Sequence, residues 1–300
     1  MKPVLILLVL LGAPIHHSAT NASPFPIENY QNPNDMVAWS SVANLSGITH
    51  NWVADEYVTV HQNQYCRFDA QLNELGCGSL ACGDCEDISF LGTNGEFYEY
   101  ALVEEGGAEG SVAIVQSPIS THNLRLDQVD VQWLTYANTA GGDAGEGVAY
   151  DALNQIFYVC IEDPQMQVLS FQRPTDSSDA TFSDGSLVVT EALSFAQLSG
   201  LLGGGADLSS CYYDQLTGRL LLLSHIGHKL SDIDLSGVLH GQIELPQAQV
   251  EGFTFNADFT QLLVVAEPNL RQIYYASDVI FSDGFESVFV SNNEIIRTLW

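Results

Sequence analysis

Basic side chains are scarce in this sequence, which holds 8 lysines and arginines against 37 aspartates and glutamates in 300 residues. The formal net charge is −29, and a surface this acidic repels the phosphates of nucleic acids. We therefore expect no nucleic acid partner. The same acidity suits the binding of divalent cations, and it equally suits plain solubility in a salty medium.

Long apolar runs are also missing: no segment beyond the first residues approaches the length that crosses a bilayer. The short run from Val4 to Leu11 follows Lys2 and precedes small and polar residues, a pattern typical of a secretory signal peptide. We place its cleavage after Ala22, so that residues 1–22 form the signal peptide. We expect an exported monomer without a transmembrane segment, located in the periplasm, in the medium or at the cell surface.

Motifs of known catalytic sites are absent as well. The sequence has no Gly-x-Ser-x-Gly elbow, no His-Glu-x-x-His and no Gly-rich loop with the Lys and Ser or Thr of a phosphate site. We therefore assign no catalytic residue, and the sequence favours a binding protein over an enzyme.

Six cysteines follow the predicted signal peptide, as expected for an oxidising compartment. Four lie close together, and we favour disulfides in a Gly-rich loop over a zinc site, since the spacing is unpaired and no His is near. The other two lie on strands of neighbouring repeats and are candidates for a bridge between them. The pairing stays open among Cys66, Cys77, Cys82, Cys85, Cys160 and Cys211.

What the sequence does contain is a unit repeated five times. Each copy has an apolar strand, a polar turn and a second apolar strand, and Val, Ile, Tyr, Phe and Leu dominate without a helical period. The copies begin with LSGITHN at Leu45, CEDISFL at Cys85, GEGVAYD at Gly145, LSSCYYD at Leu208 and VEGFTFN at Val250.

Further strands follow some of these pairs, and four-stranded units at this spacing predict an all-β fold, a β-propeller occupying residues 23–279. A solenoid would have shorter repeats, and a two-domain sandwich would not explain the phasing. Two steps between copies are long, and they hold either outer strands and loops or a degenerate sixth blade. We favour five blades, with six as the alternative. The strand MVAWSSV, from Met36, is expected to pair with the last blade and close the ring.

Residues 280–300 are expected to form a C-terminal strand or tail. This segment contains IFSDGFE, which is similar to a short terminal motif of many secreted bacterial proteins. It is therefore either a sorting segment or an ordinary last strand with an Asp-Gly turn.

Glutamate recurs at the second position of three copies, as Glu86, Glu146 and Glu251, whereas Ser46 and Ser209 take this position in the others. The inner strands of a propeller surround one axis, so we expect these carboxylates to converge and to repel one another. A hard divalent cation relieves that repulsion, and Ca²⁺, which prefers oxygen ligands, is the predicted cofactor. The alternative is that each glutamate caps a strand by accepting backbone N–H groups.

A second recurrent position ends the second strand of each copy. The spacing from the first position is sixteen residues in three copies, such as Glu146 to Glu162. We expect these residues to form the rim of a ligand pocket, with solvated turns as the alternative. The rim candidates are Glu104, Glu162, Glu267, His225 and His61.

The stretch LSSCYYDQLTGRLLLLSHIGHKLSDIDLSGVL, followed by QVEGFTFNADFTQLLVVAEPN, resembles the SdiA-regulated family. The earlier copies fit the same pattern, so the resemblance extends from Met36 to Tyr275. It implies a five-bladed propeller related to NHL-repeat proteins, with a calcium site and no established biochemical role. His225 departs from the pattern, since the family usually has an acid there, and Ser210 and Cys211 replace a glycine and a hydrophobic residue.

These features favour an exported calcium-binding propeller that binds a small molecule or a protein partner. The alternative is a metal-dependent hydrolase of the lactonase or phytase type, in which the channel metal would polarise an ester or activate water. Fold analogy alone supports that activity weakly, and no Asn and Asp pair stands beside the glutamates. A third interpretation is a structural surface protein.

Overall fold

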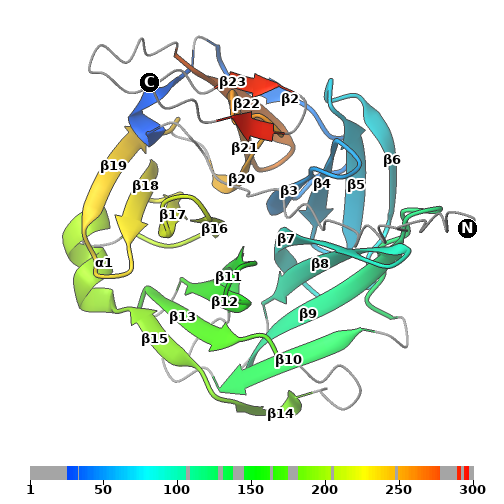
Figure 1. Cartoon of the computed structure of the whole chain (residues 1–300), viewed down its shortest axis with the longest axis horizontal. Helices are drawn as coiled ribbons and strands as arrows, with labels where there is room; N and C mark the ends of the chain where they lie inside the picture. The colour runs from blue at the N-terminus through cyan, green and yellow to red at the C-terminus, as the bar shows by residue number, and fades with distance from the viewer. Residues whose placement is uncertain are drawn as a thin grey trace, which may run out of the picture.

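The computed structural model describes residues 26–32, 34–105, 109–127, 131–137, 145–162, 165–174, 182–203, 206–246, 249–277, 289–291 and 294–296. Five sheets stand around one central axis, each with its first strand innermost (Figure 1). The predicted all-β propeller with five blades is confirmed. The predicted signal peptide, residues 1–22, and the motif IFSDGFE lie outside the described residues.

The first and fourth blades are regular four-stranded antiparallel sheets that run outward from the axis in sequence order. The first blade consists of β3 (Gly47–Asn51), β4 (Glu56–His61), β5 (Gln64–Asp69) and β6 (Glu74–Ser79). The fourth consists of β16 (Ser210–Asp214), β17 (Arg219–Ser224), β18 (Lys229–Asp234) and β19 (Leu239–Glu244).

The second and third blades contain the long steps of the sequence. The second blade consists of β7 (Cys85–Asn94), β8 (Phe97–Glu104), β9 (Glu109–Pro118) and β10 (Gln132–Ala137). The third consists of β11 (Gly145–Asp151), β12 (Ile156–Ile161), β13 (Gln167–Gln172) and β15 (Thr190–Leu193). The extra chain forms β14 (Phe182–Leu187), which pairs in parallel with β10, and α1 (Phe195–Leu202). The long steps are therefore outer strands and a helix, and they do not add a sixth blade.

The fifth blade closes the ring with strands from both ends of the propeller. It consists of β20 (Val250–Phe255), β21 (Gln261–Ala266) and β22 (Leu270–Ala276). The strands β1 (Tyr30–Gln31), after the 3₁₀ helix η1 (Ile27–Asn29), and β2 (Val37–Ala38) both pair with β22. The predicted pairing of the segment from Met36 is confirmed. In the tail, β23 (Phe289–Ser291) and β24 (Glu294–Ile296) pair with each other.

Apolar side chains fill the wedges between neighbouring blades. Strands in this position are buried on both faces, which explains the unbroken apolar run from Leu220 to Leu223 in β17. Leu221 and Leu223 pack in one cluster with Phe253 of the fifth blade, whereas Leu220 and Leu222 pack with the third. Among the described residues, no helix is long and apolar enough to cross a membrane.

Four cysteines form two disulfides within or beside the first blade. Cys66 bonds to Cys77 across β5 and β6, and Cys82 bonds to Cys85 at the start of β7. These pairs exclude the alternative of a zinc site in the cysteine loop. Cys160 on β12 and Cys211 on β16 are buried free thiols, so the candidate bridge between repeats is absent.

Candidate functional site

Each of the three recurrent glutamates is an extra residue in the ladder of its inner strand. In β11, Gly145 pairs with Ile161 and Gly147 with Cys160, which leaves Glu146 between them as a bulge. The same shift occurs at Glu86 in β7 and at Glu251 in β20. A bulge redirects the side chain of the extra residue. The repeated Glu therefore marks one repeated irregularity of the backbone.

These bulges open into a single cavity of about 250 Å³ at one mouth of the central channel. We call it the acidic cavity. Each blade contributes one residue before or within its inner strand and one after its second strand, and two further residues complete the wall. The lining residues are Ser46 and Gln62, Glu86 and Glu105, Glu146 and Glu162, Ser209 and His225, Glu251 and Glu267, with Asp84 and Gln249.

The predicted metal ligands Glu86, Glu146 and Glu251 therefore meet in one cavity, and their pKa values reflect it. Burial and the charges of the other acids raise the pKa of Glu146 to about 10. Burial and the neighbouring Asp84 raise that of Glu86 to about 8. Burial raises the pKa of Glu251 to about 7, although the nearby His225 opposes the shift. Without a cation, the fold thus holds protons on acids that are ionised in water.

The alternative role, capping of strands, is not supported by the contacts. Among the described residues, no backbone N–H donates a hydrogen bond to the side chain of Glu86, Glu146 or Glu251. The hydrogen bonds of Glu86 and Glu251 are instead made with the side chains of Asp84 and Gln249.

Two clusters of possible ligand atoms lie at the acidic cavity, and all of their residues except Asp207 line it. Oxygens of Asp84, Glu86 and Glu105 lie within 4.8 Å of one another, and so do ligand atoms of Glu162, Asp207 and His225. One carboxylate oxygen of Asp84 is buried and has no hydrogen-bond partner. Oxygen donors of this kind suit a hard cation such as Ca²⁺, and no cysteine lines the cavity.

His225 is engaged by a carboxylate. Its Nδ1 lies 2.5 Å from Oδ2 of Asp207, whose Oδ1 accepts hydrogen bonds from Ser224 Oγ at 2.6 Å and Ile226 N at 3.0 Å. Burial alone would raise the pKa of Asp207, but its bonds to His225 and Ser224 outweigh burial and lower it. The same contact raises the pKa of His225. Both shifts favour a protonated His225 that forms an ion pair with the Asp207 carboxylate.

Three of the five predicted rim residues, Glu162, Glu267 and His225, line the acidic cavity, and two do not. Glu104 accepts a hydrogen bond from Gly83 N at 2.9 Å on the exposed side, and Glu105 lines the cavity in its place. His61 is 2% exposed, with its Nε2 2.8 Å from Thr59 Oγ1, and Gln62 takes the rim position. Both predictions were wrong by one residue. Adjacent side chains of an extended chain point in opposite directions, so the neighbouring residue faces the cavity instead.

A signal for one correction was present in the sequence. Gln62 follows Ser46 by sixteen residues, the same spacing that joins Glu146 to Glu162, whereas His61 breaks that spacing. Glu105 carried no such signal, because the hairpin of β7 and β8 has a second irregularity between Phe90 and Gly92. Asp84 and Asp207 lie outside the repeated positions and were missed for that reason.

Below the acidic cavity, the next residue of each inner strand closes the channel. These five residues, which we call the waist, are Gly47, Asp87, Gly147, Ser210 and Gly252. Ser210 Oγ and Val148 N donate hydrogen bonds to Asp87 Oδ2, so a side chain from the second blade reaches the third and fourth. Gly47 lies against Asp87 and Gly147 against Ser210, since a Cβ on either glycine would lie less than 3 Å from the Cα of that neighbour.

Solved structures similar to this chain include three proteins of known description. A luciferin-regenerating enzyme is similar in structure, with a TM-score of 0.50 and 10% sequence identity over 85% of this chain and 94% of the other. At this identity the likeness shows the fold alone. A protein from Xanthomonas campestris described as a gluconolactonase has a TM-score of 0.48 at 10% identity, covering 86% of this chain and 97% of the other. A chain of a nidogen/laminin complex has a TM-score of 0.47 at 10% identity, covering 75% of this chain and 73% of the other.

Comparison with curated protein sequences gives no match. The family model described as SdiA-regulated, in contrast, matches residues 28–276, which include all five blades and every residue that lines the acidic cavity. The chain therefore belongs to the SdiA-regulated family.

Proposed function

We propose that the protein is an exported calcium-binding propeller that binds a small molecule or a protein partner at its acidic cavity. One observation carries the proposal: three glutamates from three blades, each on a bulge, meet in one cavity with four further acids and no lysine or arginine among the lining residues. Such a set repels itself unless protons or a cation neutralise it.

Ca²⁺ matches this donor set because it accepts carboxylate, hydroxyl and amide oxygens in loose geometry. Glu86, Glu146 and Glu251 would hold it, with Asp84 and Glu105 beside Glu86. The bound ion would neutralise the cavity and attract oxygen groups of a ligand. The proposed export has support from the disulfides Cys66–Cys77 and Cys82–Cys85, which form in oxidising compartments.

The test is thermal unfolding of the purified protein in EDTA and in Ca²⁺. We expect EDTA to lower the melting temperature and excess Ca²⁺ to restore it, because a ligand of the native state stabilises that state by mass action. Glu146→Gln should abolish the response, whereas Glu191→Gln, an equal charge change at an exposed residue of β15, should keep it. A melting curve that is indifferent to EDTA and Ca²⁺ would contradict the proposal.

A second candidate, metal-dependent hydrolysis, is favoured by the contact between His225 and Asp207 at the cavity wall. A histidine held by a carboxylate is a common acid or base in hydrolysis. The lining residues include no Asn beside the glutamates, and the binding role stays our preference. Lactones and phosphomonoesters assayed with Ca²⁺ should show no turnover. Turnover that Glu146→Gln or Glu251→Gln removes would establish the hydrolase instead.

A further inference from the structure

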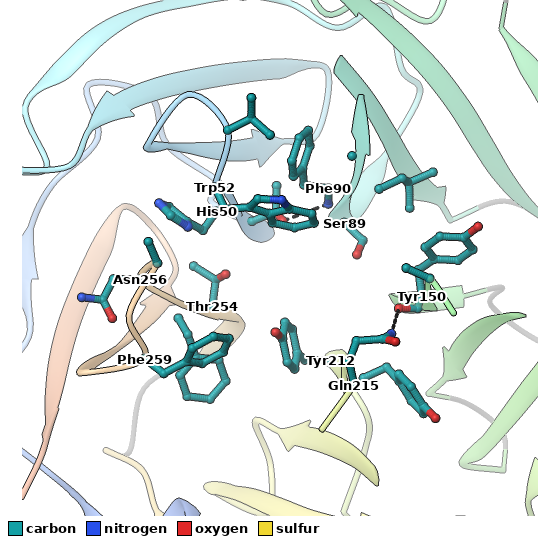
Figure 2. A pocket seen from close by; sticks show the side chains of 18 of the residues that line it. His50, Trp52, Ser89, Phe90, Tyr150, Tyr212, Gln215, Thr254, Asn256 and Phe259 are labelled. Atoms are coloured by element: carbon teal, nitrogen blue, oxygen red, sulfur yellow. Dashed lines mark hydrogen bonds between the residues drawn. The ribbon is translucent and has the colours of Figure 1, made fainter. Parts of the chain in front are cut away.

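A second cavity, of about 280 Å³, lies at the opposite ends of the inner strands. It is lined by the last residues of these strands and by the turns that follow, for example Thr254 near the end of β20 and Asn256 directly after it (Figure 2). The waist with Asp87 lies between this cavity and the acidic cavity, since Asp87 precedes Ser89 and follows Glu86 on β7. Each mouth of the channel therefore has its own pocket.

Aromatic side chains form the walls of this second cavity, which we call the aromatic pocket. It is lined by Trp52, Phe90, Tyr150, Tyr212, Phe255 and Phe259 among others. Trp52 and Phe90 lie on one side and Tyr212 and Phe259 on the other (Figure 2). The rings of Trp52 and Phe90 pack edge-on with their centroids 4.3 Å apart, and those of Tyr212 and Phe255 pack edge-on with their centroids 5.4 Å apart. These contacts fix flat apolar faces around the cavity.

The polar groups of the aromatic pocket are neutral. Among the residues that the structure describes, no Asp, Glu, Lys or Arg lines it, and its polar side chains include the hydroxyls of Ser89 and Thr254 and the amide of Gln215. Burial lowers the pKa of His50 and favours its neutral imidazole, although Asp55, whose Oδ1 lies 3.2 Å from His50 Nε2, opposes the shift. The pocket thus has no fixed charge with which to bind an ion.

Gln215 gives this pocket a specific requirement. Its Nε2 donates a hydrogen bond to Tyr150 O at 3.1 Å, whereas its Oε1 is buried and has no hydrogen-bond partner. An unpaired buried acceptor costs about 1–3 kcal/mol. Gln215 lines the pocket, and a rotation of its side chain that brings Oε1 into the cavity would let an O–H or N–H donor of a ligand recover that energy.

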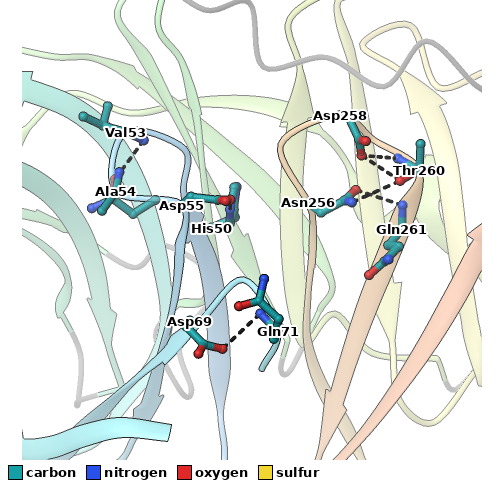
Figure 3. Close-up of polar contacts among 11 residues, drawn as sticks. His50, Val53, Ala54, Asp55, Asp69, Gln71, Asn256, Asp258, Thr260 and Gln261 are labelled. Carbon is teal, nitrogen blue, oxygen red and sulfur yellow. Dashed lines mark hydrogen bonds and ion pairs between the residues drawn. The ribbon is translucent and has the colours of Figure 1, made fainter. Parts of the chain in front are cut away.

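The turns that frame the aromatic pocket are braced by their own hydrogen bonds (Figure 3). Asn51 Oδ1 accepts from Val53 N and Ala54 N, each at 3.1 Å. In the fifth blade, Asp258 Oδ1 accepts from Thr260 N at 3.1 Å, and Asn256 Oδ1 accepts from Gln261 N at 2.8 Å. The pocket is therefore formed before a ligand arrives, which reduces the entropic cost of binding.

We propose that the aromatic pocket binds a neutral carbohydrate ring. The C–H faces of a sugar pack on aromatic rings, and its hydroxyls supply the donor that Gln215 Oε1 lacks. An anion is disfavoured because the chain carries a formal charge of −29. A hydrocarbon or a quaternary ammonium ion fits the aromatic walls but leaves Gln215 unpaired. The neutral, hydroxylated ring satisfies both the walls and the amide.

The test is ligand-observed NMR and calorimetry on the full mature chain. The probes are D-glucose, D-galactose, D-mannose, N-acetyl-D-glucosamine and maltose, with tetramethylammonium and indole for comparison. We expect at least one sugar to bind, and Trp52→Ala to remove the binding. Gln215→Leu should weaken it about tenfold, the effect of losing one buried hydrogen bond.

A matched control variant and a chelator keep this result separate from general damage and from the acidic cavity. Gln71→Leu makes the same change at an exposed turn and should bind the sugar as the unchanged protein does, and EDTA should leave sugar binding by either protein unchanged. The proposal is overturned if no sugar binds a folded protein, if Gln215→Leu binds unchanged, or if only tetramethylammonium or indole binds.

Discussion

Ser210 Oγ donates a hydrogen bond of 3.0 Å to Asp87 Oδ2 across the channel axis, between residues 123 positions apart in the sequence. Val148 N donates to the same oxygen at 3.1 Å, and Ile88 N donates to Oδ1 at 2.8 Å. Asp87, which is 2% exposed, therefore joins the second, third and fourth blades. One buried side chain links three sheets that make no shared ladder.

We expect Asp87→Ala to destabilise the protein by about 3 kcal/mol. The change leaves Val148 N and Ser210 Oγ buried without their acceptor, and it opens a void at the axis. Ser210→Ala removes only one donor, and we expect a loss of about 1 kcal/mol. Urea denaturation of the two variants measures both values. Equal losses would show that Asp87 does not hold the three blades together.

The repeated glycine after the bulge has a different role from the glutamate before it. A Cβ on Gly147 would lie 2.8 Å from Ser210 Cα and from the backbone nitrogen of Cys211, both of them backbone atoms of the next blade. We expect Gly147→Ala to destabilise the protein by about 2 kcal/mol or more, as overpacking of a rigid site does.

Gly200 in α1 is the matched control for this change. A Cβ there meets nothing within 4 Å, and alanine is favoured over glycine inside a helix by about 0.5–1 kcal/mol. Gly200→Ala should therefore stabilise the protein slightly in the same denaturation assay. A neutral Gly147→Ala variant would mean that the blades can separate at the waist.

The sequence predicts the propeller because its main signal, five apolar hairpins in phase, is also its main structural feature. It predicts the convergence of Glu86, Glu146 and Glu251 because residues at the same position of repeats arranged around one axis lie close to that axis and to one another. It misplaces Glu104 and His61 because bulges shift the alternation of side chains, and the number of bulges in a hairpin is not visible in apolar patterning.

The aromatic pocket lay beyond sequence reasoning for another reason. Its walls come from residues such as Trp52, Tyr150 and Phe259, which lie at unrelated positions in or after their strands. Aromatic residues on apolar strands look like core, and most of them here are core. Only the coordinates separate a ring that fills a wedge between blades from one that faces a cavity.

The two free thiols, Cys160 and Cys211, can be counted with a thiol reagent. Cys160 is 0% and Cys211 5% exposed, and burial raises the pKa of Cys211 well above its ordinary value. A thiol that is both buried and protonated reacts slowly. We expect Ellman's reagent to find no reactive thiol in the native protein and two per chain after unfolding. A count of zero in the unfolded chain would show that Cys160 and Cys211 are bonded after all.

The raised pKa values of the acidic cavity make stability depend on pH. Glu86, Glu146 and Glu251 titrate at about 8, 10 and 7 in the folded protein, against an ordinary value of 4.5. Between these limits the folded chain binds more protons than the unfolded chain, so the free energy of unfolding must fall as pH rises. Each such group contributes about 1.4 kcal/mol per pH unit in the range where only the unfolded form is ionised.

We therefore expect the stability measured in EDTA to decrease from pH 5 to pH 9. Glu146→Gln has no proton to lose, so between pH 5 and pH 7 its slope should be shallower by about 1.4 kcal/mol per pH unit. Glu191→Gln should keep the slope of the unchanged protein, because this exposed residue of β15 lies outside the cavity. Urea denaturation at several pH values checks this. If Glu146→Gln and Glu191→Gln give the same slope, Glu146 is ionised in the folded protein and the acids of the cavity do not oppose one another.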